Sequence, residues 1–357
     1  MITLFGATGY TGRLIAQALD GERLPFRLAG RSAARLATLS NSLDTLPPWL
    51  VADVHRPESL LDLCIDTTLL INCVGPFTDL GEPVVARAVQ SGVAYLDIDN
   101  ELGFLYRARA YDTLARANGA VIIPSCAFEV ALADCAAALL AAQFEGRSLD
   151  EVSVTYALSG MGSSRGTRRS IARTLATSWL GYRDGQWVTA VPGRRVREIT
   201  LSDKRHAALA IPSGEIITIP QHVKVKSVNT WLALRRRGAR WTARAVPQLG
   251  RLLRGPLGPL GEKVMGRSAR PPDDEQRARS GFVIGVEAIA GEERRALLLR
   301  GHDPYGLTAR IICYAARVLS QAEHQPGGVF SPAQVLGPEA FLDHAEYAWE
   351  LTVSDAG

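Results

Sequence analysis

The chain opens with an apolar run, a glycine-rich turn and an amphipathic segment. Residues 2–5 form the apolar run, and the turn at 6–12 has the sequence GATGYTG. Apolar side chains then recur at helical spacing in the segment 14–19, which predicts a helix with one buried face. A strand, a tight glycine turn and a helix in this order begin a βαβ dinucleotide-binding unit. The sequence therefore predicts a Rossmann-type parallel sheet here.

The three glycines of the turn are expected to have different structural roles. Gly6 permits a sharp exit from the strand, Gly9 lets a pyrophosphate approach the backbone, and Gly12 lets the helix pack closely on the strand. The amide groups of the first helical turn and the positive end of the helix dipole then hold the phosphates. A purely structural turn is the alternative interpretation. The predicted cofactor-binding residues of the turn are Gly6, Thr8, Gly9, Tyr10, Thr11 and Gly12.

The end of the second predicted strand, 26–29, indicates which nucleotide the turn accepts. A site for NAD usually places a carboxylate about 20 residues after the glycine turn, where it holds the ribose 2′-hydroxyl. This chain has Arg31 and Ser32 at that point, with Arg35 as a second cation nearby. A guanidinium pairs with a 2′-phosphate, whereas a carboxylate repels it, so we expect NADP (as NADPH) to be the cofactor. A solvated arginine at a strand end is the alternative.

Two further strand ends complete the predicted cofactor site. The segment 50–54 is a third predicted strand, and Asp53 at its end either reaches the adenine edge or caps the following turn. The nearly continuous apolar run 68–74 predicts the central parallel strand, because such a strand is buried on both faces. The carboxyl ends of parallel strands face the cofactor. The residues expected beside the nicotinamide ribose are Val74, Gly75 and Pro76.

The chain has 357 residues and its strand–helix alternation ends near residue 130, so two domains are expected. We predict the α/β class: a doubly wound parallel sheet of the Rossmann type over 1–130, and a second α+β domain with a mixed or antiparallel sheet over 131–302, which serves substrate binding or dimerisation. The segment from about 303 to 345 contains an amphipathic helix and is expected to pack back on the first domain. Strand-like segments of the second domain are 151–158, 186–191, 216–219, 281–289 and 294–300.

Composition argues against several classes of function. The net charge of +4 gives no case for nucleic-acid binding. Five cysteines without CxxC spacing indicate reduced thiols, and six scattered histidines have no metal-site spacing, so no metal is expected. We find no secretory segment and no apolar run of about 18 residues, so we expect a cytoplasmic protein without a membrane span.

The segment 231–254 differs from the rest of the chain. Seven arginines lie between residues 235 and 254 with no acidic residue among them, and aromatic and aliphatic side chains are interleaved. This pattern is typical of a surface for an anionic partner, such as an acyl carrier protein, a phosphopantetheine arm or a membrane surface. Exposed amphipathic helices with solvated charges would have the same pattern. A homodimer is also compatible with the sequence.

Several motifs are shared with one known family. They are GATGYTG at 6–12, AGRS at 29–32, INCVGPF at 71–77, YLDIDNE at 95–101, SSRGT at 163–167 and GGVFSPAQVLG at 327–337. Together they resemble the saccharopine dehydrogenase-like NADP-binding oxidoreductases, and within them the trans-acting enoyl reductases of polyketide and lipid synthesis. The resemblance implies hydride transfer from a nicotinamide to a conjugated C=C, C=O or C=N carbon. One motif departs from the family: where the family has Asp in Cys-Gly-Phe-Asp-Ser-x-Pro-Ser-Asp, this chain has Glu129, and it lacks the serines and the proline.

The residues leave the proton donor open. Tyr95, Asp97 and Glu101 lie in the first predicted domain, and Tyr156 lies in the second. A tyrosine can protonate a developing enolate, so Tyr156 is the candidate catalytic residue, although a tyrosine within a strand is more commonly a core residue.

Three functions are compatible with these observations. The first is reduction of the enoyl C=C bond of a carrier-bound or lipid-like acyl thioester. The second is saccharopine-reductase-like reduction of a small amino-acid-derived imine or aldehyde, with Arg165 or Arg168 bound to substrate carboxylates. The third is a protein that binds NADP without catalysis.

Overall fold

The computed structural model describes residues 1–160, 162, 164, 167–171, 179–190, 195–201, 204–234, 245, 248–249, 271–321, 326–349 and 351–355. The chain divides into two compact units. The first comprises Met1–Asn100, Phe104–Phe128 and Tyr305–Val335, and the second comprises Glu101–Gly103, Glu129–Pro304 and Leu336–Gly357.

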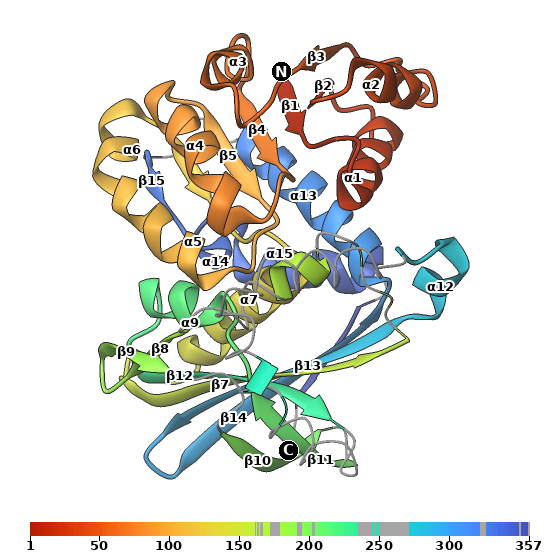
Figure 1. Cartoon of the computed structure of the whole chain (residues 1–357). Helices are drawn as coiled ribbons and strands as arrows, with labels where there is room; N and C mark the ends of the chain where they lie inside the picture. Colours follow the sequence, from red (N-terminus) through yellow and green to blue (C-terminus); the bar gives the residue numbers. More distant parts are fainter. Residues whose placement is uncertain are drawn as a thin grey trace. The chain divides into compact units, whose positions relative to one another are not determined.

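A seven-stranded parallel sheet forms the first unit, with the strand order β15-β6-β5-β4-β1-β2-β3 and helices on both faces (Figure 1). Its strands are β1 (Ile2–Phe5), β2 (Phe26–Gly30), β3 (Trp49–Val51), β4 (Leu69–Asn72), β5 (Ala94–Asp97), β6 (Val121–Ile123) and β15 (Gly328–Val329). Every residue of β1 and β4 is buried, which explains why their sequences are apolar except at Thr3 and Asn72. The strand order reverses between β1 and β4, so the expected Rossmann-type sheet is confirmed.

The third strand differs from its expected bounds. It spans Trp49–Val51, so Asp53 lies in the turn that follows the strand and does not end it. Both Trp49 and Val51 are exposed, because β3 is an edge strand with one neighbour. The buried apolar residues Ala52 and Val54 follow the end of β3, and they extended the apolar pattern of the sequence beyond the strand.

Helices connect the parallel strands of the first unit. They are α1 (Tyr10–Gly21), α2 (Ala33–Ser40), α3 (Pro57–Asp62), α4 (Phe77–Gln90), α5 (Leu102–Ala108), the 3-10 turn η1 (Arg109–Tyr111), α6 (Asp112–Asn118) and α13 (Pro304–Gln321). The α1 helix buries Ile15, Ala16 and Leu19 at the spacing that the sequence showed.

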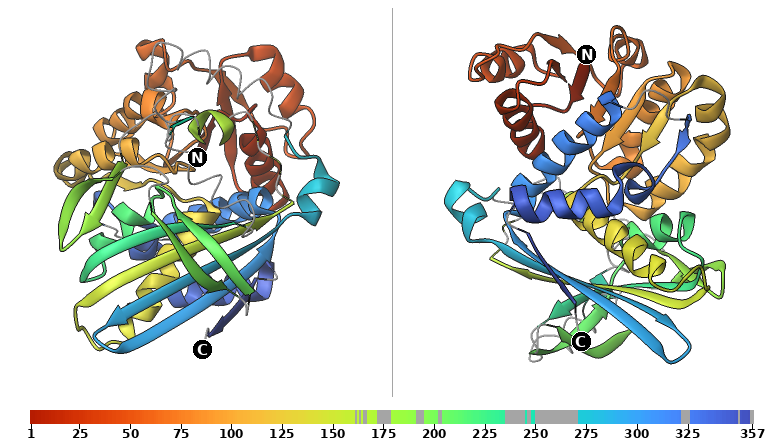
Figure 2. Two further views of the ribbon diagram at one scale, coloured as in Figure 1. Left: turned by 60° about the horizontal axis from the view of Figure 1, so that its bottom comes forward. Right: turned by 180° about the vertical axis from the view of Figure 1, so that it is seen from behind.

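The α13 helix, from the far end of the chain, lies alongside α1 (Figure 2). The rings of Tyr10 and Tyr305 meet edge to face at 4.9 Å, and Arg317 pairs with Glu22 at the other end of α1. After α13, β15 adds to the sheet beside β6, and Asp112 accepts the Val329 N–H at 2.8 Å. The C-terminal segment thus supports the helix that follows the glycine turn.

A nine-stranded sheet forms the second unit. Its main path is β10-β11-β12-β7-β13-β14-β16, and the hairpin β8-β9 joins it at β12. The β12 and β7 strands are parallel and the other pairs are antiparallel, so the expected mixed sheet is confirmed. The strands are β7 (Leu149–Ser159), β8 (Trp179–Arg183), β9 (Gln186–Ala190), β10 (Val196–Leu201), β11 (Lys204–Ala210), β12 (Val225–Leu234), β13 (Gly281–Ala290), β14 (Glu293–His302) and β16 (Thr352–Asp355).

Two long helices, α7 and α15, cover one face of this sheet (Figures 1 and 2). The helices of the second unit are α7 (Phe128–Ala142), α9 (Glu215–Thr218), the 3-10 turn η2 (Ile219–Gln221), α12 (Asp274–Arg279) and α15 (Pro338–Trp349). The α14 helix (Pro332–Leu336) belongs to the first unit except for its last residue. The α7 helix is apolar on every side, and residues 130–137 are all buried, as expected for a helix enclosed by other elements. No helix in the described part of the chain combines the length and the apolar character needed to cross a membrane.

One strand expected in the second domain is absent from the described residues, and one residue of the stretch 231–254 is buried. Residues 216–219 lie in α9 and η2 and not in a strand, because a run of four residues, three of them isoleucine, is too short for its periodicity to separate a buried helical turn from a buried strand. Residues 231–234 end β12, and Trp231 is buried there, so it does not contribute to an exposed basic surface. Apart from 245 and 248–249, the remainder of 231–254 lies outside the described residues.

The α1 helix offers a direct test of close packing at the glycine turn. A Cβ on Gly12 would lie 2.3 Å from the carbonyl oxygen of Gly6, whereas a Cβ on Gly21 would meet nothing within 4 Å. We therefore expect Gly12→Ala to lower the free energy of unfolding by about 1–3 kcal/mol, as overpacked sites do. Gly21→Ala, in the same helix, should change it by less than about 1 kcal/mol and in the stabilising direction. Urea denaturation of both variants measures the difference, and equal values would contradict the packing argument.

Candidate functional site

The glycine turn lies against the end of β4. Gly6 has a φ of +84°, and a Cβ there would lie 2.9 Å from the carbonyl carbon of Cys73 and from a methyl group of Val74. Gly12 has no room for a Cβ beside Gly6, as described above. The turn after β1 and the turn after β4 therefore meet at the point where the strand order reverses. Open α/β sheets bind their ligands in the crevice at this switch point.

The N-terminus of α1 lies in the same glycine turn. Its N-cap residue is Gly9, which has no side chain to accept a hydrogen bond from the first helical turn, and that turn contains no acidic residue. The first amides of a helix need partners from outside it, and the helix dipole favours an anionic partner. Gly9 is exposed and leaves space for such a group. The geometry of the turn thus fits a phosphate-bearing ligand.

Basic side chains border the turn on the β2 side. Arg35 donates to the carbonyl oxygen of Thr8 at 3.0 Å, which holds the first turn of α2 beside the glycine turn. Ser32 is the N-cap of α2 and accepts the Arg35 N–H at 3.4 Å. Arg31 is exposed and has no carboxylate partner among the described residues. Its guanidinium is therefore available to an anion.

Asp53 closes its own turn. One carboxylate oxygen accepts the His55 N–H at 3.1 Å, and the Asp53 N–H donates to Ser59 at 2.9 Å. The N-cap residue of α3 is Arg56. Asp53 is therefore a turn residue between β3 and α3, and its contact with adenine stays a prediction.

A buried asparagine holds the turn that follows β4. Asn72 is fully buried, its amide group donates to the Tyr95 hydroxyl at 3.1 Å, and its amide oxygen accepts the Val74 N–H at 3.0 Å. These bonds fix the start of the stretch Val74–Pro76, in which Gly75 is exposed. Sequence reasoning did not single out Asn72. The signal was a polar residue inside an otherwise apolar strand.

Asp97 ties the ends of β5 and β6 together. It is fully buried, and one carboxylate oxygen accepts the N–H groups of Asp99 at 3.0 Å and Ser125 at 2.7 Å. Ser125 has a φ of +60° and donates its hydroxyl to the Asp99 carbonyl at 2.7 Å. Burial and the negative charge of Asp97 raise the pKa of Tyr95 well above its ordinary value, so this tyrosine stays protonated. Asp97 therefore organises the edge of the sheet.

In the second unit, the Tyr156 hydroxyl on β7 lies between the Glu215 side chain of α9 and the backbone of Glu129 in α7. Tyr156 is 3% exposed, and its hydroxyl hydrogen-bonds the Glu215 carboxylate and lies 3.4 Å from the Glu129 carbonyl oxygen. Burial raises the pKa of Glu129 to about 7, with a further contribution from the charge of Glu215. Burial also raises the pKa of Glu215, and burial and Glu215 raise that of Tyr156. The cluster therefore retains protons at neutral pH.

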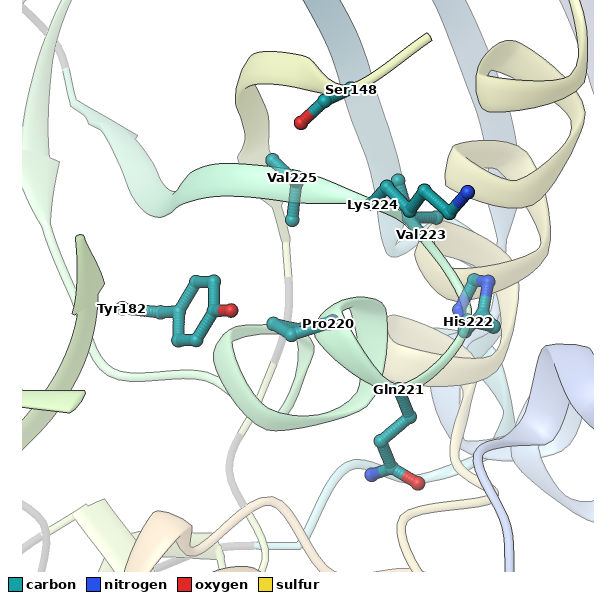
Figure 3. Close-up of a pocket in the computed structure, with 8 residues that line it drawn as sticks. All are labelled: Ser148, Tyr182, Pro220, Gln221, His222, Val223, Lys224 and Val225. Carbon is teal, nitrogen blue, oxygen red and sulfur yellow. The ribbon is translucent and has the colours of Figure 1, made fainter. Parts of the chain in front are cut away.

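A histidine–aspartate pair lies beside a pocket of the second unit. The pocket has a volume of about 540 Å³ (Figure 3). Its lining residues are Ser148, Tyr182, Pro220, Gln221, His222, Val223, Lys224 and Val225. The ring of His222 lies 2.9 Å from Asp134, which is fully buried in α7. Burial lowers the pKa of His222, but the charge and hydrogen bond of Asp134 outweigh it, so the net shift is upward.

Comparisons with known proteins find the same fold over the whole chain. The saccharopine dehydrogenase (L-Glu forming) of Saccharomyces cerevisiae superposes with a TM-score of 0.66 over 100% of this chain and 99% of that one, at 12% identity. In sequence, the chain is 37% identical over 143 residues to a protein of Arabidopsis thaliana named as a probable mitochondrial saccharopine dehydrogenase-like oxidoreductase. The resemblance to the saccharopine dehydrogenase-like oxidoreductases is confirmed.

A second relative is a trans-acting enoyl reductase of Mycobacterium ulcerans, which is 36% identical over 139 residues. Each of the two sequence matches covers 36% of this chain and 32% of the relative. The matched segment thus spans about a third of the length of these relatives. No protein-family model matches the chain.

Other predicted residues lie apart from these groups or outside the described residues. Ser170 donates to Glu101 at 2.6 Å within the second unit, which includes Glu101. Ser163, Arg165 and Gly166 of the SSRGT stretch are outside the described residues. Among the residues that the structure describes, no group of three or more His, Cys, Asp or Glu side chains could hold a metal ion.

The His222–Asp134 pair predicts a dependence of stability on pH. Because the pKa of His222 is raised above its ordinary value of about 6.5, the pair contributes fully below about pH 6.5, and the contribution is lost as the pH rises through the folded-state pKa. We expect His222→Gln to lower the free energy of unfolding by about 1–3 kcal/mol at pH 6 and by less at pH 8. Chemical denaturation at both values measures this. The exposed His55, changed to Gln, serves as the control, and a loss that grows toward pH 8 would contradict the assignment.

Proposed function

We propose that the chain is an NADP-dependent oxidoreductase. The observation that carries this proposal is the glycine turn after β1, which lies against the end of β4 and precedes the uncapped amide end of α1. A dinucleotide pyrophosphate fits this place because the N-cap residue of α1 is a glycine, which leaves the amide groups of the first helical turn without a side-chain partner. The stretch Val74–Pro76, held by Asn72, is the proposed edge for the nicotinamide ribose.

The exposed Arg31 supports the choice of NADP over NAD. It follows β2, where an NAD site has a carboxylate for the ribose 2′-hydroxyl, and Arg35 beside it is already joined to the glycine turn. A guanidinium forms two parallel hydrogen bonds with a phosphate, which favours the phosphorylated ribose.

We propose the reduction of an enoyl C=C bond in a carrier-bound or lipid-like acyl substrate. The similarity to a trans-acting enoyl reductase supports this choice. A bound nicotinamide would supply the hydride, and this chain would hold the cofactor, orient the substrate and provide a proton. The basic stretch 231–254 as a surface for a carrier protein or a membrane, the homodimer and the cytoplasmic location all remain predictions.

The choice of cofactor can be tested at Arg31. Arg31→Asp should raise the dissociation constant for NADPH by at least about 10²-fold, because it removes a charge-assisted pair of about 1.5–3 kcal/mol and adds repulsion. The dissociation constant for NADH should change by less than about threefold. Arg23→Asp makes the same change of charge just beyond the other end of α1, a helix about 18 Å long, and should affect neither. Isothermal calorimetry measures all three chains, and equal losses for both cofactors would refute the assignment to the 2′-phosphate.

The substrate class can be tested by NADPH consumption. We expect oxidation of NADPH with a trans-2-enoyl thioester such as crotonyl-coenzyme A, and a rate at least about tenfold lower with an amino-acid semialdehyde supplied with glutamate. The opposite order would favour the reduction of an amino-acid-derived imine or aldehyde. Tight NADPH binding without consumption with either probe would favour a protein that binds NADP without catalysis.

A further inference from the structure

We propose that the pocket between β8, η2 and the start of β12 binds an organic phosphate, with the phosphate group beside His222 and Lys224 and the apolar part over Pro220. This inference goes beyond the proposed function, because it assigns a second ligand site that does not depend on the cofactor. All eight residues that line the pocket belong to the second unit, whereas the glycine turn belongs to the first.

The size and lining of the pocket fit a ligand with an apolar part. Its volume of about 540 Å³ lies within the range of about 300–1,000 Å³ that small-molecule sites have, and a phosphate group alone would fill a small part of it. Pro220 and Val225 supply apolar surface. In Figure 3, Tyr182 lies on one side of Pro220, with its hydroxyl directed inward, and His222 and Lys224 lie on the other side. The pocket is therefore apolar in the middle and cationic at one end.

One ring nitrogen of His222 is held by the protein and the other is available to a ligand. Nε2 lies 2.9 Å from the buried Asp134 carboxylate, and Nδ1 has no hydrogen-bond partner among the residues that the structure describes. Burial alone would lower the pKa of His222, but the charge and hydrogen bond of Asp134 raise it. The ring therefore keeps a second N–H to a higher pH than an exposed histidine, and Asp134 fixes its orientation.

Lys224 supplies a charge that the protein does not compensate. It is exposed and forms no ion pair within the described part of the chain. Lys226, two residues further along, is also exposed, but it pairs with Asp150 at 2.7 Å. None of the eight described residues that line the pocket is acidic, so an anion there meets two basic side chains and no carboxylate in the lining.

Two hydroxyl groups add further hydrogen-bond donors. Those of Ser148 and Tyr182 have no hydrogen-bond partner in the described ranges of the chain, and the Tyr182 ring is held edge to face against Trp187 at 4.9 Å. Around the pocket, four side chains thus have N–H or O–H groups that a ligand can use.

This set of donors favours a phosphate over a carboxylate. A phosphate ester offers three terminal acceptor oxygens and a charge of about −1.5 to −2, whereas a carboxylate offers two oxygens and a single charge. Lysine binds phosphate as a point charge, whereas the planar fork of arginine matches a carboxylate, and none of the described lining residues is arginine. The lining therefore matches a phosphate at the cationic end of the pocket.

Calorimetry with phenyl phosphate at pH 6.5, where the raised pKa keeps His222 mainly protonated, tests the site. Lys224→Gln should raise the dissociation constant at least about tenfold, because it removes a charge-assisted hydrogen bond. Lys226→Gln is the matched control, since it removes the same charge from the same stretch of chain outside the pocket, and it should stay within about twofold of the parent chain. Unchanged affinity in Lys224→Gln, or an equal loss in both variants, would overturn the proposal.

Two further probes test the class of ligand. Inorganic phosphate lacks the apolar part and should bind at least about tenfold more weakly than phenyl phosphate. Phenylacetate keeps the ring but carries a carboxylate, and it should also bind at least about tenfold more weakly. Equal affinity for inorganic phosphate would refute the apolar part of the assignment, and equal or tighter binding of phenylacetate would refute the choice of phosphate.

NMR of the parent chain locates the probe without any variant at Lys224. The ring resonance of His222, which is identified by its loss in His222→Gln, should shift when phenyl phosphate is added. The resonance of His302, an exposed histidine of the same unit, should stay in place. A His222 resonance that does not respond while calorimetry detects binding would place the probe elsewhere and overturn the proposal.

Arg31→Asp separates this site from the proposed cofactor site. Because Arg31 lies in the first unit, this variant should bind phenyl phosphate within about twofold of the parent chain while it loses affinity for NADPH. If Arg31→Asp loses the probe and Lys224→Gln keeps it, the probe binds at the glycine turn and the pocket proposal fails. If the parent chain binds phenyl phosphate as expected but does not bind NADPH, the proposed function fails and the pocket proposal stands.

Discussion

The close approach of two turns, one after β1 and one after β4, is the constraint on which the first unit depends. The turn after β1 can lie there only because Gly6 carries no Cβ and has a left-handed backbone, and α1 can begin there only because Gly12 leaves room for the Gly6 carbonyl. The amide end of α1 and the end of β4 are thereby presented to the same space. A Cβ at either glycine would collide with the neighbouring backbone and force these elements apart.

Buried polar side chains make the neighbouring strand ends rigid. Asn72 and Asp97 are fully buried, and each satisfies backbone N–H groups that would otherwise lie unpaired at the edge of the sheet. An unpaired polar group in the interior costs about 1–3 kcal/mol, whereas a hydrogen bond contributes about 0.5–1.5 kcal/mol. These two residues therefore fix the loops after β4, β5 and β6, and the edge beside the proposed nicotinamide site keeps one shape.

In the second unit, burial changes the pKa values of carboxyl groups. Three carboxyl groups, those of Glu129, Glu215 and Asp134, lie within or beside the buried face of α7, where ionisation is unfavourable. Asp134 is compensated by His222, and Glu215 by hydroxyl donors. Glu129 has neither a cation nor a hydroxyl donor among the groups that shift its pKa, so burial raises that pKa to about 7.

Local patterns in the sequence determined the parallel sheet, the glycine turn, the cation at Arg31 and the β13–β14 pair, because glycine spacing and continuous apolar runs act over a few residues. Only the tertiary structure decided that residues 216–219 are helical and that Trp231 is buried, since burial by distant elements overrides short apolar patterns. It also decided the cluster of Glu129, Tyr156 and Glu215, which come from a helix, a strand and a short turn far apart in the chain. Their proximity follows from sheet packing, and their raised pKa values follow from the burial that this packing produces.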